Sequence, residues 1–261
     1  MRVEAVSEWA NLLVRWFHVF AGILWIGSTW YFTWLDRQLQ RDPAGVWMVH
    51  SGGFYLVEKQ GDPKVDPAKI HWFRFEALFT WLSGLLLLML VYYLGGLMDD
   101  SALPEGQAIA VGIGLIVVGW FAYDLFWISP LGKRPLAGAA ASYLALVALA
   151  WALTRLFNGR AAYMHLGAMM GTIMALNVWL RILPAQKKLV AAIAAGQPPD
   201  ARLAEQAKDR SKHNTFLILP VVMTMISSHF PTATYGSEYN WQVFAVLTLL
   251  GWGAAKVLRA R

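Results

Sequence analysis

Histidine is the residue type in this chain best suited to cofactor chemistry. Of the six histidines, five lie in or at the ends of long apolar segments: His18, His71, His165, His213 and His229. Neutral imidazole binds haem iron, and helix bundles place cofactors between facing helices. At 1.5 Å of rise per helical residue, His18 and His165 are expected towards the outer face of a membrane. His71 and His213 are expected towards the inner face, so the spacing predicts one or two haem b groups bound by these four histidines.

Other interpretations of the histidines stay open. A histidine at a helix end commonly forms hydrogen bonds at the membrane interface, which applies most to His50 and His229. For His18, deep in an apolar segment, a proton relay or another metal site is the alternative. No HExxH or HxH pattern indicates zinc.

Charged residues inside the apolar segments are the second set of candidates. Arg15 precedes His18 by one helical turn, so both share a helix face. This suits a contact to a haem propionate or an anionic substrate, or snorkelling to the interface. Asp124 could pair with Arg74 or Arg181 or take protons from a substrate, and Glu76 has the same two interpretations.

Composition predicts a protein that crosses the membrane several times. Among 261 residues, 57% are hydrophobic and only 15% are charged, against about a quarter charged in a soluble domain. The net charge of +6 is spread over short loops, so no nucleic-acid partner is expected. The absence of cysteine excludes disulfides, iron–sulfur clusters and CxxCH haem within this chain. The N-terminal segment shows no cleavable signal pattern.

The predicted fold is an all-α membrane protein, a single domain over 1–261 with seven or eight transmembrane helices. Lysine and arginine gather in alternate connecting segments and in the tail, which predicts the N-terminus outside. Segment 37–69 is expected to fold against the bundle on the cytoplasmic side. Segment 184–212 is expected to be an amphipathic cytoplasmic connector on the membrane surface. The seven spans are expected at 9–35, 70–94, 109–127, 136–157, 163–183, 215–229 and 241–258.

Several long motifs resemble one family. They are WANLLVRWFHVFAGILWIGSTWYFTWLD, HSGGFYLVEKQ, HWFRFEALFTWLSG, MHLGAMMGTIMALNVWLRILPAQ and SKHNTFLILPVVMTMISSHFP. They are similar to segments of the integral-membrane, cytochrome c-linked urate oxidases, and the resemblance covers essentially the whole chain.

The resemblance implies oxidation of urate to 5-hydroxyisourate in a bacterial inner membrane, with water as the oxygen source. Electrons would pass through b-type haem to a c-type cytochrome. Better-known members carry a C-terminal cytochrome c domain, whereas this sequence ends at Arg261 and has no cysteine. The acceptor is therefore expected to be a separate protein or a domain outside this chain.

A urate site is then expected where the inner-side candidates gather. Arg74 would bind the anion, and Glu76 or Asp124 would act as the base. His50 and the pair Gly52-Gly53 would contact the substrate, since glycine permits close backbone approach. The aromatic rings that could stack on the purine are those of Phe54 and Tyr55.

Two other classes of protein share these features. A proton-coupled transporter would use the same intramembrane charges, although no inverted repeat is visible. A haem b anchor subunit would transfer electrons without a substrate of its own. A retinal protein is excluded because the last span has only Lys256, at its inner end. Homo-oligomer formation stays open.

Overall fold

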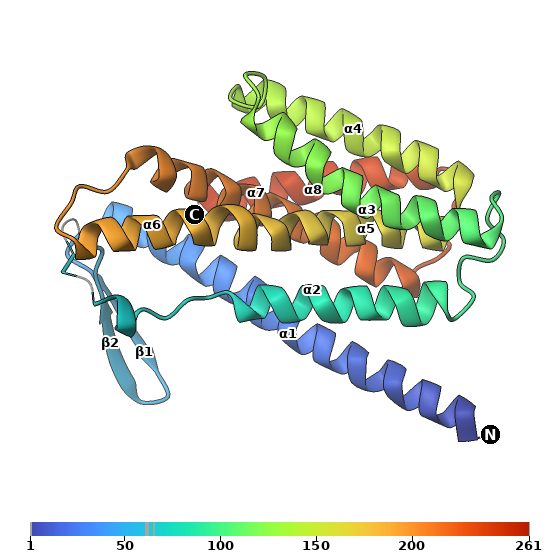
Figure 1. The fold of residues 1–261 in the computed structure, drawn as a ribbon, viewed down its shortest axis with the longest axis horizontal. Helices are drawn as coiled ribbons and strands as arrows, with labels where there is room; N and C mark the ends of the chain where they lie inside the picture. Colours follow the sequence, from blue (N-terminus) through green and yellow to red (C-terminus); the bar gives the residue numbers. More distant parts are fainter. Residues whose placement is uncertain (1, 61–62, 65, 261) are drawn as a thin grey trace.

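Long helices form almost the whole of this computed structural model, which describes residues 2–60, 63–64 and 66–260 (Figure 1). The α-helices are α1 (Arg2–Arg41), α2 (Phe75–Leu87), α3 (Glu105–Ile128), α4 (Pro135–Leu156), α5 (Gly159–Leu176), α6 (Leu183–Ala194), α7 (Ala201–Ile226) and α8 (Asn240–Ala260). Two π-helical turns, η2 (Leu88–Tyr93) and η3 (Asn177–Ile182), continue α2 and α5. Short 3-10 turns are η1 (Pro67–Lys69) and η4 (Ser227–His229).

The α-helices combine into seven rods, because α5, η3 and α6 run on without a break. Six segments are long and apolar enough to cross a membrane: 5–41, 75–93, 105–128, 135–156, 159–194 and 240–260. The seventh rod is α7, whose apolar half begins near Thr215 and packs along α5. The prediction of a multi-pass all-α membrane protein is confirmed.

The connections alternate between the two ends of the bundle. The N-terminus and the segments before α3, α5 and α8 lie at one end, on the right in Figure 1. The β-hairpin and the turn between α6 and α7 lie at the other end. This second end carries the basic segments, which are expected on the cytoplasmic side.

The fifth rod departs from the prediction that a span ends at Pro184. The helix passes through Pro184 into α6 and pairs with the first half of α7, so segment 184–212 forms a helical hairpin that extends both spans (Figure 1). Proline lacks the amide donor of a regular helix and crowds the preceding turn. The wider π-turn η3 immediately before it accommodates this defect. The predicted break at 196–199 is confirmed by the end of α6 at Ala194.

The fifth rod, formed by α5, η3 and α6, is the most buried of the six apolar segments, and its α5 part lies at the centre of the bundle. Its neighbours α2, α3, α4 and α7 surround it. A hydrogen bond of 3.0 Å from Trp81 Nε1 to Thr172 Oγ1 ties it to α2. In contrast, α1 packs mainly against α2 and leaves most of its apolar surface exposed, as expected for contact with lipid.

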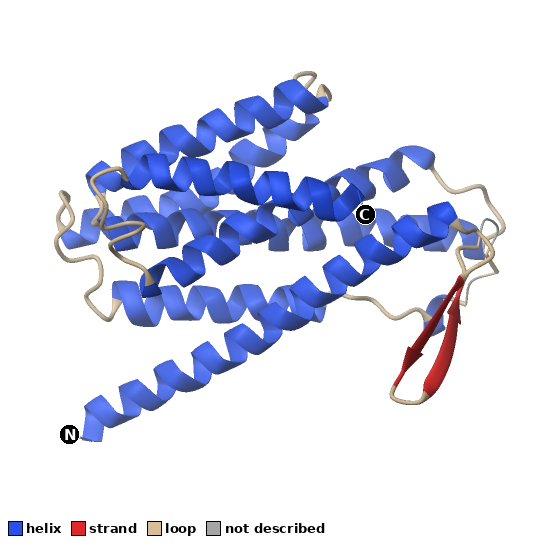
Figure 2. Ribbon diagram, turned by 180° about the vertical axis from the view of Figure 1, so that it is seen from behind, coloured by secondary structure: helices blue, strands red, loops and turns tan. Residues whose placement is uncertain are grey.

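Segment 37–69 contains the only strands of the described residues, β1 (Val46–His50) and β2 (Gly53–Val57). They form a hairpin whose turn has positive φ at Ser51 (49°) and Gly52 (77°), as a type I′ turn requires. The hairpin projects from the bundle (Figure 2) and meets α1 through Tyr31 and Met48. Segment 37–69 also meets the bundle through the ion pair of Lys59 with Asp36 and through the contact of η1 with α6.

Candidate functional site

A buried ion cluster joins α3, η3 and α7 at the basic end of the bundle. The Asp124 carboxylate accepts hydrogen bonds from Arg181 Nε (2.9 Å) and Arg210 Nη2 (2.8 Å), and Arg181 Nη2 contacts its second oxygen. Asp124 is 7% exposed and Arg210 is 3% exposed. Buried charges need partners, and the carboxylate here is shared by the buried Arg210 and by Arg181, whose side chain is 32% exposed. The cluster therefore carries an excess positive charge.

A chain of neutral hydrogen bonds lies beside this cluster. Asn214 Nδ2 donates to the Met174 carbonyl (2.9 Å), which turns Asn214 Oδ1 towards Asn177. Asn177 Nδ2 donates to that oxygen and to the Tyr123 hydroxyl oxygen, both at 2.9 Å. The Tyr123 proton is then directed to His213 Nδ1, 2.7 Å away. Each donor in the chain thus has a defined direction.

The local helix geometry explains why these residues meet. Tyr123 and Asp124 are adjacent on α3, and they are reached by Asn177 and Arg181, which are four apart in the π-turn η3. Residues four apart lie on one face of a helix, so Asn177 and Arg181 point to the same side of the rod. Arg210 and Asn214 are also four apart on α7, so they share a face there.

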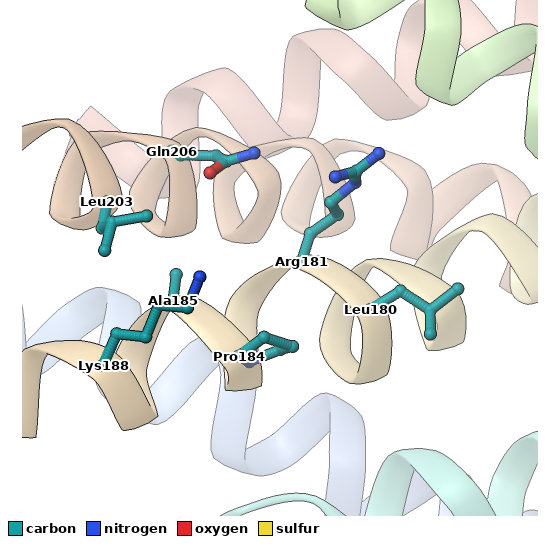
Figure 3. A pocket seen from close by; sticks show the side chains of 7 residues that line it. All are labelled: Leu180, Arg181, Pro184, Ala185, Lys188, Leu203 and Gln206. Carbon is teal, nitrogen blue, oxygen red and sulfur yellow. The ribbon is translucent and has the colours of Figure 1, made fainter. Parts of the chain in front are cut away.

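A cleft of about 180 Å³ opens between α6 and α7 next to the cluster. Figure 3 shows the Gln206 amide pointing towards Arg181, while Lys188 extends from α6 towards α7. The cleft is far smaller than the roughly 300–1,000 Å³ of drug-sized pockets, so it suits a small ligand and excludes a porphyrin. Its lining residues are Leu180, Arg181, Pro184, Ala185, Lys188, Leu203 and Gln206.

The expected haem ligands His18 and His165 do not converge. His18 Nδ1 lies 3.0 Å from the Thr80 carbonyl oxygen, whereas His165 Nε2 lies 3.0 Å from the Tyr93 hydroxyl. Thr80 and Tyr93 are thirteen residues apart along one rod, or roughly 20 Å at 1.5 Å per residue. One iron cannot join His18 to His165 across that separation.

The surroundings of His165 also argue against a haem between these two histidines. His165 is 0% exposed, and a Cβ at Gly112 would lie 2.6 Å from its Nε2, so no porphyrin plane fits there. His71 is exposed and packs edge-on to Phe73, whereas His213 packs against Trp127. Among the described residues, no group of three or more His, Cys, Asp or Glu could hold a metal. The residues present do not fit the haem predicted between His18 and His165.

Of the residues expected at the urate site, only Asp124, a candidate base, lies in the cluster. Of the two partners expected for it, Arg74 and Arg181, the structure pairs it with Arg181. The Arg74 guanidinium instead lies over the Phe75 ring (4.8 Å) and near the Trp179 ring (5.9 Å). Glu76 is in the first turn of α2. Arg15 contacts Asn11 on its own helix.

The hairpin carries the remaining predicted contacts: His50, Gly52, Gly53, Phe54 and Tyr55. His50, Phe54 and Tyr55 are exposed there. No hydrogen bond or ring contact of the described residues joins them to Arg74. The predicted grouping of hairpin and Arg74 is therefore not what the structure brings together.

Sequence reasoning missed Arg210, Asn177, Asn214 and Gln206. In the sequence, Arg210 is one of several basic residues that predict the orientation in the membrane, and its surroundings there do not indicate that it is buried. The signal that could have found it is the i, i+4 spacing of Arg210 and Asn214 just before an apolar segment.

The fold and site together define a multi-pass helical membrane protein with a buried cationic cluster beside a small cleft. The family model described as Urate oxidase N-terminal matches residues 4–261. The chain therefore belongs to this family. No curated protein and no solved structure matches it.

Proposed function

We propose that this protein is a membrane-bound urate oxidase that binds the urate anion in the cleft between α6 and α7. The observation that carries the proposal is the position of the cleft. In a chain of the urate oxidase family, it lies against a buried cluster with excess positive charge. A cationic site with hydrogen-bonding groups and some apolar side chains suits a flat purine anion.

Each polar residue of the cleft has a counterpart on urate. Arg181 uses Nε and Nη2 on Asp124, which leaves Nη1 outside these bonds. Gln206 presents both a donor and an acceptor, which matches a carbonyl next to an N–H on the purine edge. Lys188 adds a charge at the rim, while Pro184 and Leu203 offer apolar contact to the ring.

Asp124 acts in this proposal as a positioning residue. Its carboxylate is held by Arg181 and Arg210, so it fixes the orientation of the Arg181 fork instead of serving as a free base. The reaction converts the urate monoanion and one water into 5-hydroxyisourate, one proton and two electrons. The cleft opens at the basic end of the bundle, so the released proton can leave to solvent there.

The two electrons leave in two one-electron steps to two acceptor molecules, because no side chain of the cleft can take them. We propose a c-type cytochrome as this partner and a bacterial inner membrane as the location, with the basic end in the cytoplasm. No step of this reaction is routed through haem b, because the predicted ligand pair His18 and His165 does not fit it.

The test compares two neighbouring lysines in protein reconstituted in lipid nanodiscs. Lys188 lines the cleft and Lys187 does not. Urate-dependent reduction of a soluble c-type cytochrome is expected in the wild type. Lys188→Gln should raise KM about fivefold, from about 1 kcal/mol for a partly exposed charge contact, while Lys187→Gln should leave KM unchanged. A wild type that reduces no acceptor with urate contradicts the function, and equal effects of the two variants contradict the location.

A further inference from the structure

The β-hairpin of β1 and β2 has one face made entirely of exposed apolar side chains. Residues paired across antiparallel strands lie on the same side of the sheet, and so do residues two apart along a strand. The pairs Trp47–Leu56 and Val49–Phe54 therefore form one face, called here the apolar face. The exposed fractions of its members are 70% for Trp47, 65% for Val49, 77% for Phe54 and 43% for Leu56. Residues 46–57 contain no Asp, Glu, Lys or Arg, so the face has the character of a contact surface.

The opposite face of the hairpin is the one that meets the protein. The Tyr31 hydroxyl of α1 donates a 3.4 Å hydrogen bond to Met48 Sδ on that face. Successive residues of a strand point to opposite sides of the sheet, so the apolar face is turned away from α1. A two-stranded hairpin on its own is only marginally stable in water, and burial of this face would stabilise it.

The contact with Tyr31 sets the level of the hairpin along the membrane axis. Tyr31 precedes the last residue of α1, Arg41, by ten positions, which is roughly 15 Å along the helix at 1.5 Å per residue. After leaving α1, the chain therefore folds back towards the membrane. Figures 1 and 2 agree with this, because the tip of the hairpin is displaced towards the end of the bundle where the N-terminus lies.

Exposed aromatic rings gather at the same level. The Tyr31 ring lies 5.3 Å from that of Phe32 and 6.1 Å from that of Trp34, measured between ring centres. Phe73, just before α2, packs 4.9 Å from Phe32. All four rings are between 42% and 50% exposed. Aromatic rings at the ends of spans are typical of the membrane interface, so α1 and α2 cross the interface where the hairpin is held.

We propose that the hairpin is a membrane anchor whose apolar face inserts into the lipid leaflet at the basic end of the bundle. Each strand pairs on one side only, so its outer edge keeps backbone N–H and C=O groups that hydrocarbon cannot satisfy. The hairpin therefore lies in the interface, where water and headgroups reach these edges, and its apolar side chains enter the boundary between headgroups and acyl chains. The anchor does not depend on the proposed urate site.

The first experiment measures the depth of single labels in the membrane. The chain has no cysteine, so one introduced cysteine can carry the fluorophore NBD in protein reconstituted in nanodiscs with nitroxide-labelled lipids. Phe54→Cys places the label on the apolar face, and Tyr55→Cys places it on the opposite face of the same strand. Gln197→Cys, at the exposed turn between α6 and α7, is the aqueous reference.

The label at position 54 should emit at shorter wavelength and be quenched by the lipid nitroxides, at a depth of about 5–10 Å into the boundary region. Position 55 should be quenched less, and position 197 should not be quenched. Quenching at 54 no stronger than at 197 overturns the anchor, and equal quenching at 54 and 55 overturns the assignment of the apolar face. Emission at shorter wavelength without lipid quenching means that a second copy or another protein covers the face, which overturns lipid as the occupant.

The second experiment adds a charge to each face in turn, with the label at Val49→Cys on the apolar face. Phe54→Asp should reduce the lipid quenching of this label, because a carboxylate is costly to move out of water. Tyr55→Asp, on the opposite face, should reduce it less. Both side chains are exposed, so neither change disturbs the packed core of the bundle. Equal quenching in the two variants contradicts insertion through the apolar face.

Discussion

Asp124 is the only anion in the buried cluster, so its neutralisation tests how the cluster is held together. Asp124→Asn would leave the Arg181 and Arg210 guanidinium groups facing each other without a counter-charge. Removing one partner of a buried ion pair costs about 3–5 kcal/mol. At about 2–4 °C per kcal/mol for a chain of this size, Tm should fall by roughly 6–20 °C. Thermal unfolding followed by intrinsic tryptophan fluorescence in nanodiscs measures this directly.

The matched control is Asp36→Asn, because Asp36 pairs with Lys59 and the two side chains are 42% and 63% exposed. This exposed pair contributes about 0–1 kcal/mol. A second variant, Asp124→Asn combined with Arg210→Met, removes one charge of each sign. It should recover at least about 1 kcal/mol relative to the sum of the single variants. If Asp124→Asn lowers Tm no more than Asp36→Asn, the cluster is not the buried, charge-dependent unit described here.

Two further predictions concern packing and the neutral hydrogen bonds. Gly112→Ala places a Cβ 2.6 Å from His165 Nε2 and should destabilise by about 1–3 kcal/mol; Gly114→Ala, with nothing within 4 Å, should not lower Tm. Tyr123→Phe removes the hydroxyl that contacts His213 and Asn177 and should cost about 1–3 kcal/mol. Tyr143→Phe removes one 3.3 Å hydrogen bond and should lower Tm less. Equal Tm values within either pair of variants would contradict these contacts.

Most of the fold follows from the sequence because a membrane imposes long apolar segments. Six helices satisfy the length and hydropathy expected of a span. The exception is the junction at Pro184, where proline usually marks an end. The helix continues there because η3 relaxes the preceding turn, and the sequence carries no clear mark of a π-turn.

The hairpin shows a different limit of sequence reasoning. The pair Gly52-Gly53 indicates a close backbone approach to a ligand, yet the structure uses Ser51 and Gly52 as a two-residue turn. Both uses of glycine rest on the same freedom of φ, so the sequence cannot separate them.

The site was predictable only in part, for a physical reason. Asp124 and Arg181 stand out because charges are rare in apolar helices. Arg210 lies in the polar half of α7, where a charge costs nothing until tertiary packing buries it. His18 and His165 were predicted to pair because they lie at similar depths in their spans. They contact different parts of the rod that contains Thr80 and Tyr93, so the two histidines are far apart.

Equilibrium binding of radiolabelled urate to the nanodisc protein is the most direct test of the central claim, that the cleft between α6 and α7 is the urate site. The comparison is between Gln206→Leu, which alters a lining residue, and Gln186→Leu, which alters an exposed residue outside the lining. Loss of a hydrogen bond to a charged ligand costs about 1.5–3 kcal/mol, so Gln206→Leu should raise Kd roughly 10- to 150-fold. Gln186→Leu should bind as the wild type does. Equal Kd values for the two variants would contradict this location for the urate site.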